Sequence, residues 1–170
     1  MRPMVRETTA DDLEDLGRLW NDGRVMRWVG FPDGLGCGED DLRAWFDRLR
    51  SSCDEHHFVI RDTDLGFCGE LFYRVDGEHR RAELDIKLLP EAQGRGIATV
   101  GLSWLIERVF DEEPGLDAVW TEPTPENHAS RALYTRCGLS ETRRPGDLRP
   151  GPSYWERRRP EPSTRQSCPG

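Results

Sequence analysis

The sequence predicts a single domain of the α/β or α+β class, and three observations support this prediction. The chain has 170 residues, enough for one domain with a substantial core. Apolar residues alternate in some segments, as in half-buried strands, and recur every three or four residues in others, as in amphipathic helices. These segments follow the order strand, two helices, three strands, helix, strand, helix and two strands, without an internal repeat.

The N-terminal part of the chain is predicted to contain a short strand and two amphipathic helices. Residues 4–8 form the strand. A helix at residues 8–22 begins at a threonine cap, carries acidic residues at its positive end and has one apolar stripe. Glycines and a proline interrupt residues 23–38, which we therefore expect to be a loop. Residues 39–50 repeat apolar side chains at helical spacing and form the second helix.

The middle of the chain has the pattern of strands. Two strands are predicted at residues 56–62 and 64–76, with a turn between them, and a third at residues 81–89. The third strand alternates clearly. Its leucines and isoleucine lie on one face, and two acidic residues lie on the other together with Lys87, the only lysine of the chain.

A nearly apolar helix dominates the C-terminal half. It runs from Ile97 to Phe110 and has few polar side chains on any face, so we expect it to be deeply packed. Residues 160–170 show no periodicity; residues 1–159 are therefore predicted to form the domain and the rest a disordered tail. The remaining elements are a strand at 116–122, a helix at 126–138 with Asn127 as a candidate cap, and two closing strands at 140–144 and 152–158.

Composition and charge limit the classes of partner. The formal net charge of -8 argues against binding to nucleic acid or to an anionic membrane and suits a cationic small molecule, although solubility alone also explains an acidic chain. Five cysteines without a C-x-x-C pair argue against a disulfide framework or a zinc site. With no signal peptide and no apolar run of about 20 residues, the protein is expected to be cytoplasmic.

The turn before the apolar helix can bind an anion. Gly94 and Gly96 have no Cβ atoms, so a ligand can approach the main chain where the helix start leaves N–H groups unpaired. The helix dipole and Arg95 add positive charge, which favours a phosphate or pyrophosphate. A purely structural role of the glycines is the alternative. The P-loop lysine is missing and Gly101 breaks the Rossmann spacing, so a different phosphate-bearing cofactor is indicated.

Two segments in register resemble the GNAT superfamily of N-acetyltransferases. The first is the turn QGRGIA, residues 93–98, which matches a family signature of Gln or Arg, two residues, Gly, one residue, and Gly or Ala. The second is VWTEPTPENHASRALYTRCGL, with Asn127 and Tyr134. The match spans about residues 83–139. Within the superfamily the chain is similar to ribosomal-protein alanine N-acetyltransferases and to aminoglycoside N-acetyltransferases, and the residues do not separate these branches.

The resemblance implies a mixed, mostly antiparallel sheet of about six or seven strands, flanked by about four helices and splayed between the fourth and fifth strands. Acetyl-CoA would lie in this opening as co-substrate, and no metal is implied. The backbone of Leu88 and Leu89 would pair with its pantetheine arm, and Asn127 would hydrogen-bond the same arm. The residues implied for the pyrophosphate and its turn are Gln93, Gly94, Arg95, Gly96, Ile97, Ala98 and Thr99.

The expected chemistry is acetyl transfer to a primary amine, of a protein N-terminus or a small cationic molecule, by direct attack in a ternary complex. An amine of pKa about 10 must lose a proton before it attacks, and a carboxylate can take that proton. Asp85 is the first choice of base, and Glu83 shares its strand face. Both can instead be solvated surface groups, or bind a cationic acceptor. Tyr134 occupies the general-acid position of the family, with a core aromatic as the alternative.

Aromatic residues are candidates for the wall of an acceptor pocket. Trp28, Phe31 and Trp155 can attract a cation through their rings, and ordinary packing is the alternative. The main alternative function is a non-catalytic acyl-CoA-binding sensor on the same fold, which needs neither Tyr134 nor Asp85. A nucleotide-phosphate enzyme would lack its lysine. A homodimer is left open as the assembly.

Overall fold

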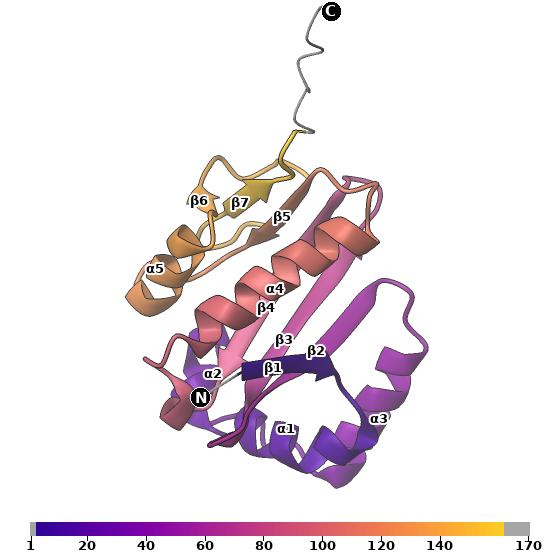
Figure 1. Ribbon diagram of the computed structural model, residues 1–170, viewed down its shortest axis with the longest axis vertical. Helices are drawn as coiled ribbons and strands as arrows, with labels where there is room; N and C mark the ends of the chain where they lie inside the picture. The colour runs from indigo at the N-terminus through magenta and orange to yellow at the C-terminus, as the bar shows by residue number, and fades with distance from the viewer. Residues whose placement is uncertain (1–2, 162–170) are drawn as a thin grey trace, which may run out of the picture.

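The computed structural model describes residues 3–161, which form one mixed β-sheet with helices on both faces (Figure 1). The strands are β1 (Pro3–Glu7), β2 (Glu55–Asp62), β3 (Gly66–Asp76), β4 (Arg81–Leu88), β5 (Ala118–Thr121), β6 (Ser140–Glu141) and β7 (Trp155–Arg158). The α-helices are α1 (Leu13–Trp20), α2 (Gly23–Met26), α3 (Glu39–Arg50), α4 (Ile97–Glu112) and α5 (His128–Arg136), and short 3-10 helices are η1 (Ala10–Asp12), η2 (Arg27–Val29) and η3 (Pro90–Ala92).

The limits of the described chain affect two expectations. Most of the tail predicted to be disordered, residues 162–170, lies outside the described residues. Within residues 3–161, no helix has the length and apolar character needed to cross a bilayer.

The sheet opens at one place. Its strands follow the order β1-β2-β3-β4-β5-β7-β6, and all neighbours are antiparallel except β4 and β5. These two pair only over Arg81–Glu83 and Ala118–Trp120. Pro123 follows shortly after β5 and cannot donate to a ladder, whereas β4 continues to Leu88 alongside β3. The expected splay between the fourth and fifth strands is confirmed, and it leaves one edge of β4 open.

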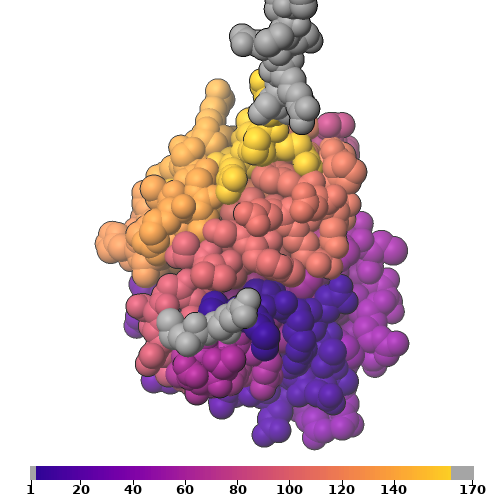
Figure 2. Space-filling model, viewed as in Figure 1, coloured from indigo at the N-terminus to yellow at the C-terminus, as the bar shows by residue number. Residues whose placement is uncertain are grey.

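Alternation along β2 separates two hydrophobic cores. Phe58 and Ile60 pack in a cluster with α4 and α5, whereas Val59 packs with α1, α2 and α3 on the other face. α4 crosses the sheet (Figure 1). On the surface seen in Figure 2 it lies between the orange C-terminal part and the indigo N-terminal part of the chain. Gly101 permits the close approach, since a Cβ there would lie 2.9 Å from Ile60 Cδ1. The predicted packing is confirmed for the face of this helix that lies on the sheet, whereas Val100 on the outer face is 50% exposed.

The segment 23–38 is not the loop that we predicted, because α2 and η2 lie within it. The Asp22 side chain accepts a hydrogen bond at 2.9 Å from the backbone N–H two residues later and caps α2. Val25 and Met26 are buried in the cluster with α1 and α3, and this packing outweighs the low helix propensity of glycine. As a result, η2 holds Trp28 at a fixed place near the open edge of β4.

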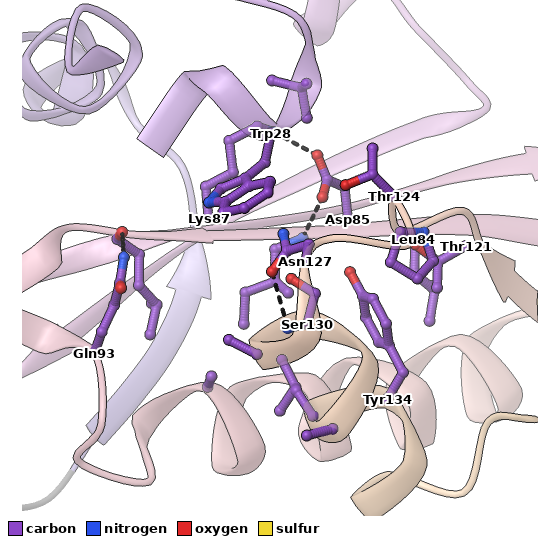
Figure 3. Close-up of a pocket in the computed structure, with 18 of the residues that line it drawn as sticks. Trp28, Leu84, Asp85, Lys87, Gln93, Thr121, Thr124, Asn127, Ser130 and Tyr134 are labelled. Atoms are coloured by element: carbon purple, nitrogen blue, oxygen red, sulfur yellow. Dashed lines mark hydrogen bonds and ion pairs between the residues drawn. The ribbon is translucent and has the colours of Figure 1, made fainter. Parts of the chain in front are cut away.

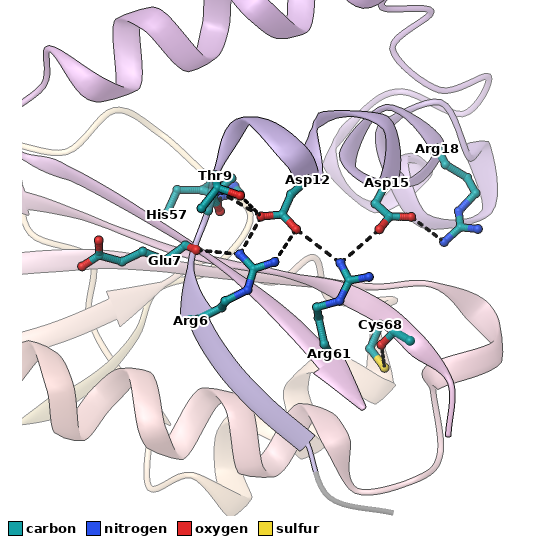
Figure 4. Close-up of polar contacts among 11 residues, drawn as sticks. Arg6, Glu7, Thr9, Asp12, Asp15, Arg18, His57, Arg61 and Cys68 are labelled. Atoms are coloured by element: carbon teal, nitrogen blue, oxygen red, sulfur yellow. Dashed lines mark hydrogen bonds and ion pairs between the residues drawn. The ribbon is translucent and has the colours of Figure 1, made fainter. Parts of the chain in front are cut away.

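A buried carboxylate joins β1, η1 and β2 (Figure 4). Asp12 is 1% exposed and accepts two hydrogen bonds at 2.7 Å from Arg6. It also accepts bonds from Arg61 at 3.2 Å and from the Thr9 N–H at 2.9 Å. Burial alone would raise the pKa of Asp12, but the bonds from Arg6 and Thr9 outweigh it, and the pKa is lowered. The cluster therefore fixes the first helical segment to the edge of the sheet.

Asp12→Ala is expected to lower the free energy of unfolding at pH 7 by about 2 kcal/mol, because the hydrogen bonds of a buried carboxylate to two partly exposed guanidinium groups are lost. The pKa of Asp12 is depressed by folding, so its contribution is present above the unfolded pKa of about 3.9 and is lost as the pH falls through the folded pKa. Urea denaturation between pH 7 and pH 3 should show wild type and variant converging. Asp15→Ala removes a more exposed partner of Arg61 and should cost under about 1 kcal/mol. Equal losses in the two variants would contradict this account.

Candidate active site

The opening between β4 and β5 forms a cavity of about 910 Å³ (Figure 3). Its walls come from η2, β4, the turn after β4, the end of β5 and α5. Elements that are far apart in the sequence therefore bring most of the predicted site residues together. Those that line the cavity are Trp28, Glu83, Asp85, Leu88, Gln93, Gly94, Gly96, Ala98, Thr99, Asn127 and Tyr134.

Five of the predicted residues are not among the residues that line the cavity. Phe31 is 47% exposed on the surface, and Trp155 is buried in the core. The Leu89 N–H donates to a carbonyl of β3 at 2.9 Å, and its side chain is buried in the cluster with α1. Arg95 Nε donates to a carbonyl of η3 at 2.9 Å, and the Ile97 side chain packs in the core below α4. Leu89, Arg95 and Ile97 therefore brace the site with their side chains.

The turn after β4 is shaped to receive an anionic group. Gly94 and Gly96 have φ angles of 72° and 79°, in the left-handed region, and a Cβ at either position would point into open space. Gly96 is the N-cap of α4, so the first N–H groups of a 16-residue helix lie beside the cavity. The Gln93 side chain donates to the Leu88 carbonyl at 3.0 Å and ties the turn to β4. This arrangement fits a pyrophosphate.

The open edge of β4 offers main-chain groups to an extended ligand. Alternate residues of a strand point to opposite edges, and the Leu89 N–H points to β3, so the main-chain groups of Leu88 and Ile86 point the other way. The Ile86 N–H donates at 2.8 Å to the carboxylate of Asp85, and the Leu88 carbonyl is held by Gln93. A ligand strand can replace these side chains as the partner of the edge.

Two carboxylates lie at the other end of the cavity and differ in their contacts. Asp85 Oδ2 is 2.5 Å from Lys87 Nζ, so this carboxylate is ion-paired. Glu83 Oε2 is 3.5 Å from Arg74 Nη1, at the limit of a hydrogen bond. Burial raises the pKa of Glu83, and the nearby carboxylates of Asp85 and Glu122 raise it further against the opposing effect of Arg74. A carboxylate with a raised pKa is better suited to accept a proton.

The helix α5 brings two predicted residues to the cavity. Figure 3 shows the Tyr134 ring pointing from α5 toward β4, and the side chain is buried. Burial, and next the charge of Asp85, raise the pKa of Tyr134, so the phenol stays protonated at neutral pH and can donate. Asn127 caps α5 by accepting a bond at 3.1 Å from the Ser130 N–H. Its amide nitrogen takes no part in that bond and can donate to a ligand.

Comparison with known proteins identifies the family. A family model described as an acetyltransferase (GNAT) domain matches residues 2–140. The chain belongs to the GNAT family. It is an N-acetyltransferase, and the match covers the cavity walls from η2 to Tyr134. The superfamily expected from the two motifs is confirmed.

Relatives of this GNAT acetyltransferase act on polyamines by name. The spermidine N(1)-acetyltransferase of Escherichia coli K12 is 30% identical over 82% of this chain and 72% of its own length. The structure of spermidine N-acetyltransferase from Vibrio cholerae in complex with CoA and spermine has a TM-score of 0.78 and is 21% identical, covering 92% of this chain and 95% of that one. A dodecameric structure of the same enzyme has a TM-score of 0.69, is 22% identical and covers 92% and 91%. The two motifs did not single out this branch.

Sequence reasoning missed part of this GNAT site. The alternation along β4 placed Lys87 on the same face as the two acidic residues, but no role in the site was assigned to it. The other residues become neighbours only through sheet register and the packing of α5, which leave no local signal. The unpredicted residues that line the cavity include Phe72, Lys87, Thr121, Glu122 and Ser130.

Proposed function

We propose that this enzyme transfers the acetyl group of acetyl-CoA to a primary amine of a small cationic acceptor, by direct attack in a ternary complex. One observation carries the proposal: a single cavity runs from the glycine turn to the two carboxylates, with Tyr134 between them on α5. The names of the polyamine-acetylating relatives support the choice of a small cation over a protein N-terminus.

The cofactor end is proposed to hold acetyl-CoA. The backbone amides from Gly94 to Thr99 bind the pyrophosphate, and the Leu88 edge of β4 binds the pantetheine arm together with Asn127. Leu89 is left out of the pairing, because its N–H is already bonded to β3. Acetyl-CoA supplies an activated acyl group, so the enzyme needs no covalent intermediate.

The acceptor end is proposed to remove a proton and stabilise the leaving group. Glu83, rather than the ion-paired Asp85, takes the proton from the ammonium, because its pKa is raised toward the working range. The free amine attacks the thioester, and the intermediate then expels the thiolate, while the second proton on the nitrogen passes to that thiolate or to water to leave the neutral amide. Tyr134 donates a hydrogen bond to the departing sulfur, whose pKa of about 8.5 makes full proton transfer from a phenol unnecessary.

Trp28 is proposed to bind the cationic body of the acceptor. It lines the cavity from η2, and the guanidinium of Arg27 lies 4.8 Å from its ring centroid, which supports a role of the ring in binding a cation. A ring face and two carboxylates suit an alkylammonium chain.

An amine panel tests the proposed function. Release of the CoA thiol should be fastest with spermidine or spermine, slower with an aminoglycoside and slowest with a peptide that begins with alanine. Faster turnover of the peptide would overturn the acceptor class. Binding of acetyl-CoA without turnover of any amine would instead support the sensor module.

Glu83→Gln is expected to lower kcat at pH 7 by about a hundredfold, because the proton acceptor is lost. The affinity for acetyl-CoA, measured by calorimetry, should stay the same. Glu55→Gln is the matched control: Glu55 shares the Arg74 partner at 3.1 Å but is not among the residues that line the cavity. A rate in Glu83→Gln equal to that of the control would exclude Glu83 as the base.

A further inference from the structure

A largely buried lysine lies beside the two carboxylates of the cavity. Lys87 Nζ is 2.5 Å from Asp85 Oδ2 and 2.9 Å from Glu70 Oε1, and its side chain is 11% exposed. The ammonium also lies 5.4 Å from the centroid of the Phe72 ring, in the same wall. The proposed reaction gives this lysine no role, although it occupies the acceptor end of the cavity.

Glu70 holds the lysine from the far side. It faces Lys87 directly across β3 and β4, and its side chain is 2% exposed. Its Oε2 accepts a bond from Trp20 Nε1 at 2.6 Å and lies 3.2 Å from His57 Nε2. Burial would raise the pKa of Glu70, but Lys87 and His57 outweigh it and lower the pKa to about 2. Because Glu70 stays ionised and buried, Lys87 cannot leave it without stranding a charge.

Lys87 in turn fixes Asp85. One oxygen of Asp85 contacts the ammonium, and the other accepts the Ile86 N–H at 2.8 Å. Both oxygens of this carboxylate are therefore engaged. Glu83 has only the long contact of 3.5 Å to Arg74 among the polar contacts within the described residues, so it keeps an oxygen for a proton.

We propose that Lys87 is the positioning residue of the active site: it keeps Asp85 fixed and charge-balanced, so that Glu83 alone accepts the proton and Tyr134 keeps its ability to donate. The proposal rests on the proposed function, since it assigns roles within that reaction. This role of Lys87 also explains why a cationic side chain lies in a cavity that is proposed to bind a cationic acceptor.

The charges around these groups give the direction of the effect. The Asp85 carboxylate raises the pKa of Tyr134 and Lys87 lowers it, after the larger effect of burial. Without Lys87, the unbalanced Asp85 charge should raise the pKa of Glu83 as well, because like charges disfavour ionisation. The charged groups that face Glu83 are Arg74 from β3, Asp85 from β4, Glu55 from β2 and Glu122 after β5.

The test is the pH dependence of kcat with both substrates saturating. In Lys87→Met, the acidic limb of this profile should move up by about one pH unit, which lowers kcat about tenfold at pH values well below the Glu83 pKa. Lys87→Arg retains the positive charge, so the acidic limb of its kcat profile should lie at the wild-type pH. In an Asp85→Asn background, the Asp85 charge that Lys87 balances beside Glu83 is already gone, so Lys87→Met should move the acidic limb much less.

Two outcomes of the kinetic test overturn the proposal: an unchanged acidic limb in Lys87→Met, or an equal shift of this limb in both backgrounds. If Lys87→Met fails to fold, the charge-balanced pair Glu70→Gln with Lys87→Met replaces it, with the same expectations. Carbon-13 NMR titration of the Glu83 carboxyl makes the same comparison without turnover. A higher Glu83 pKa in Lys87→Met supports the proposal and an unchanged one refutes it, even if the amine panel disproves the proposed function.

Discussion

Replacing Gly96 with valine is expected to weaken acetyl-CoA binding by about a hundredfold or more. The Cβ at this position points into the open space next to the first N–H groups of α4, where the pyrophosphate is proposed to lie. Hydrogen bonds to a charged group contribute about 1.5–3 kcal/mol each, so losing one or two gives a factor of this size. Isothermal titration calorimetry with acetyl-CoA measures it directly.

The control for this variant must share its backbone strain. Gly66 has a φ of 73° and open space around its Cβ position, but it begins β3 and is not among the residues that line the cavity. Gly66→Val should therefore lose stability by a similar amount, about 1–3 kcal/mol, and bind acetyl-CoA normally. Undiminished binding by Gly96→Val would place the pyrophosphate elsewhere and remove the basis of the cofactor assignment.

Tyr134→Phe is expected to reduce kcat by about a hundredfold and to leave the affinity for acetyl-CoA within about a factor of two. The phenol would stabilise the sulfur only as negative charge develops on it, and an interaction made only in the transition state affects kcat rather than binding. Stopped-flow measurement of thiol release in a single turnover separates this step from product release.

A second buried tyrosine controls for the loss of a hydroxyl group. Tyr154 is 2% exposed, stacks on Trp120 and donates to Glu156 at 2.8 Å, and it is not among the residues that line the cavity. Tyr154→Phe should therefore keep wild-type turnover. If Tyr134→Phe turns over as fast as this control, the leaving thiolate departs without help from the protein, and Tyr134 has a packing role only.

The sequence predicted those parts of the site whose cause is local. A left-handed turn needs residues without a Cβ, and Gly94 and Gly96 stand where the turn requires them. The cap of α5 needs a short polar side chain, and Asn127 provides it. The apolar pattern of α4 and the alternation of β4 likewise follow from the period of the chain, so both elements were found with nearly correct ends.

The parts that sequence reasoning missed depend on contacts between distant segments. Residues 23–38 have the local composition of a loop, and their helical turns are stabilised only by the packing of Val25 and Met26 against α1 and α3. The engagement of the Leu89 N–H follows from its register with β3, which no short stretch of sequence specifies. The pairing of Lys87 with Glu70 has the same origin, because a one-residue slip between β3 and β4 would place them on opposite faces.

The open edge of β4 has a further consequence, for the behaviour of the protein in solution. A strand edge with unpaired main-chain groups is a template for pairing with another molecule, and it promotes aggregation. Here Asp85 and Gln93 cover two of these groups with their own side chains. We therefore expect these two side chains to limit pairing of this edge with another chain, and we expect coenzyme A in the buffer to reduce aggregation further.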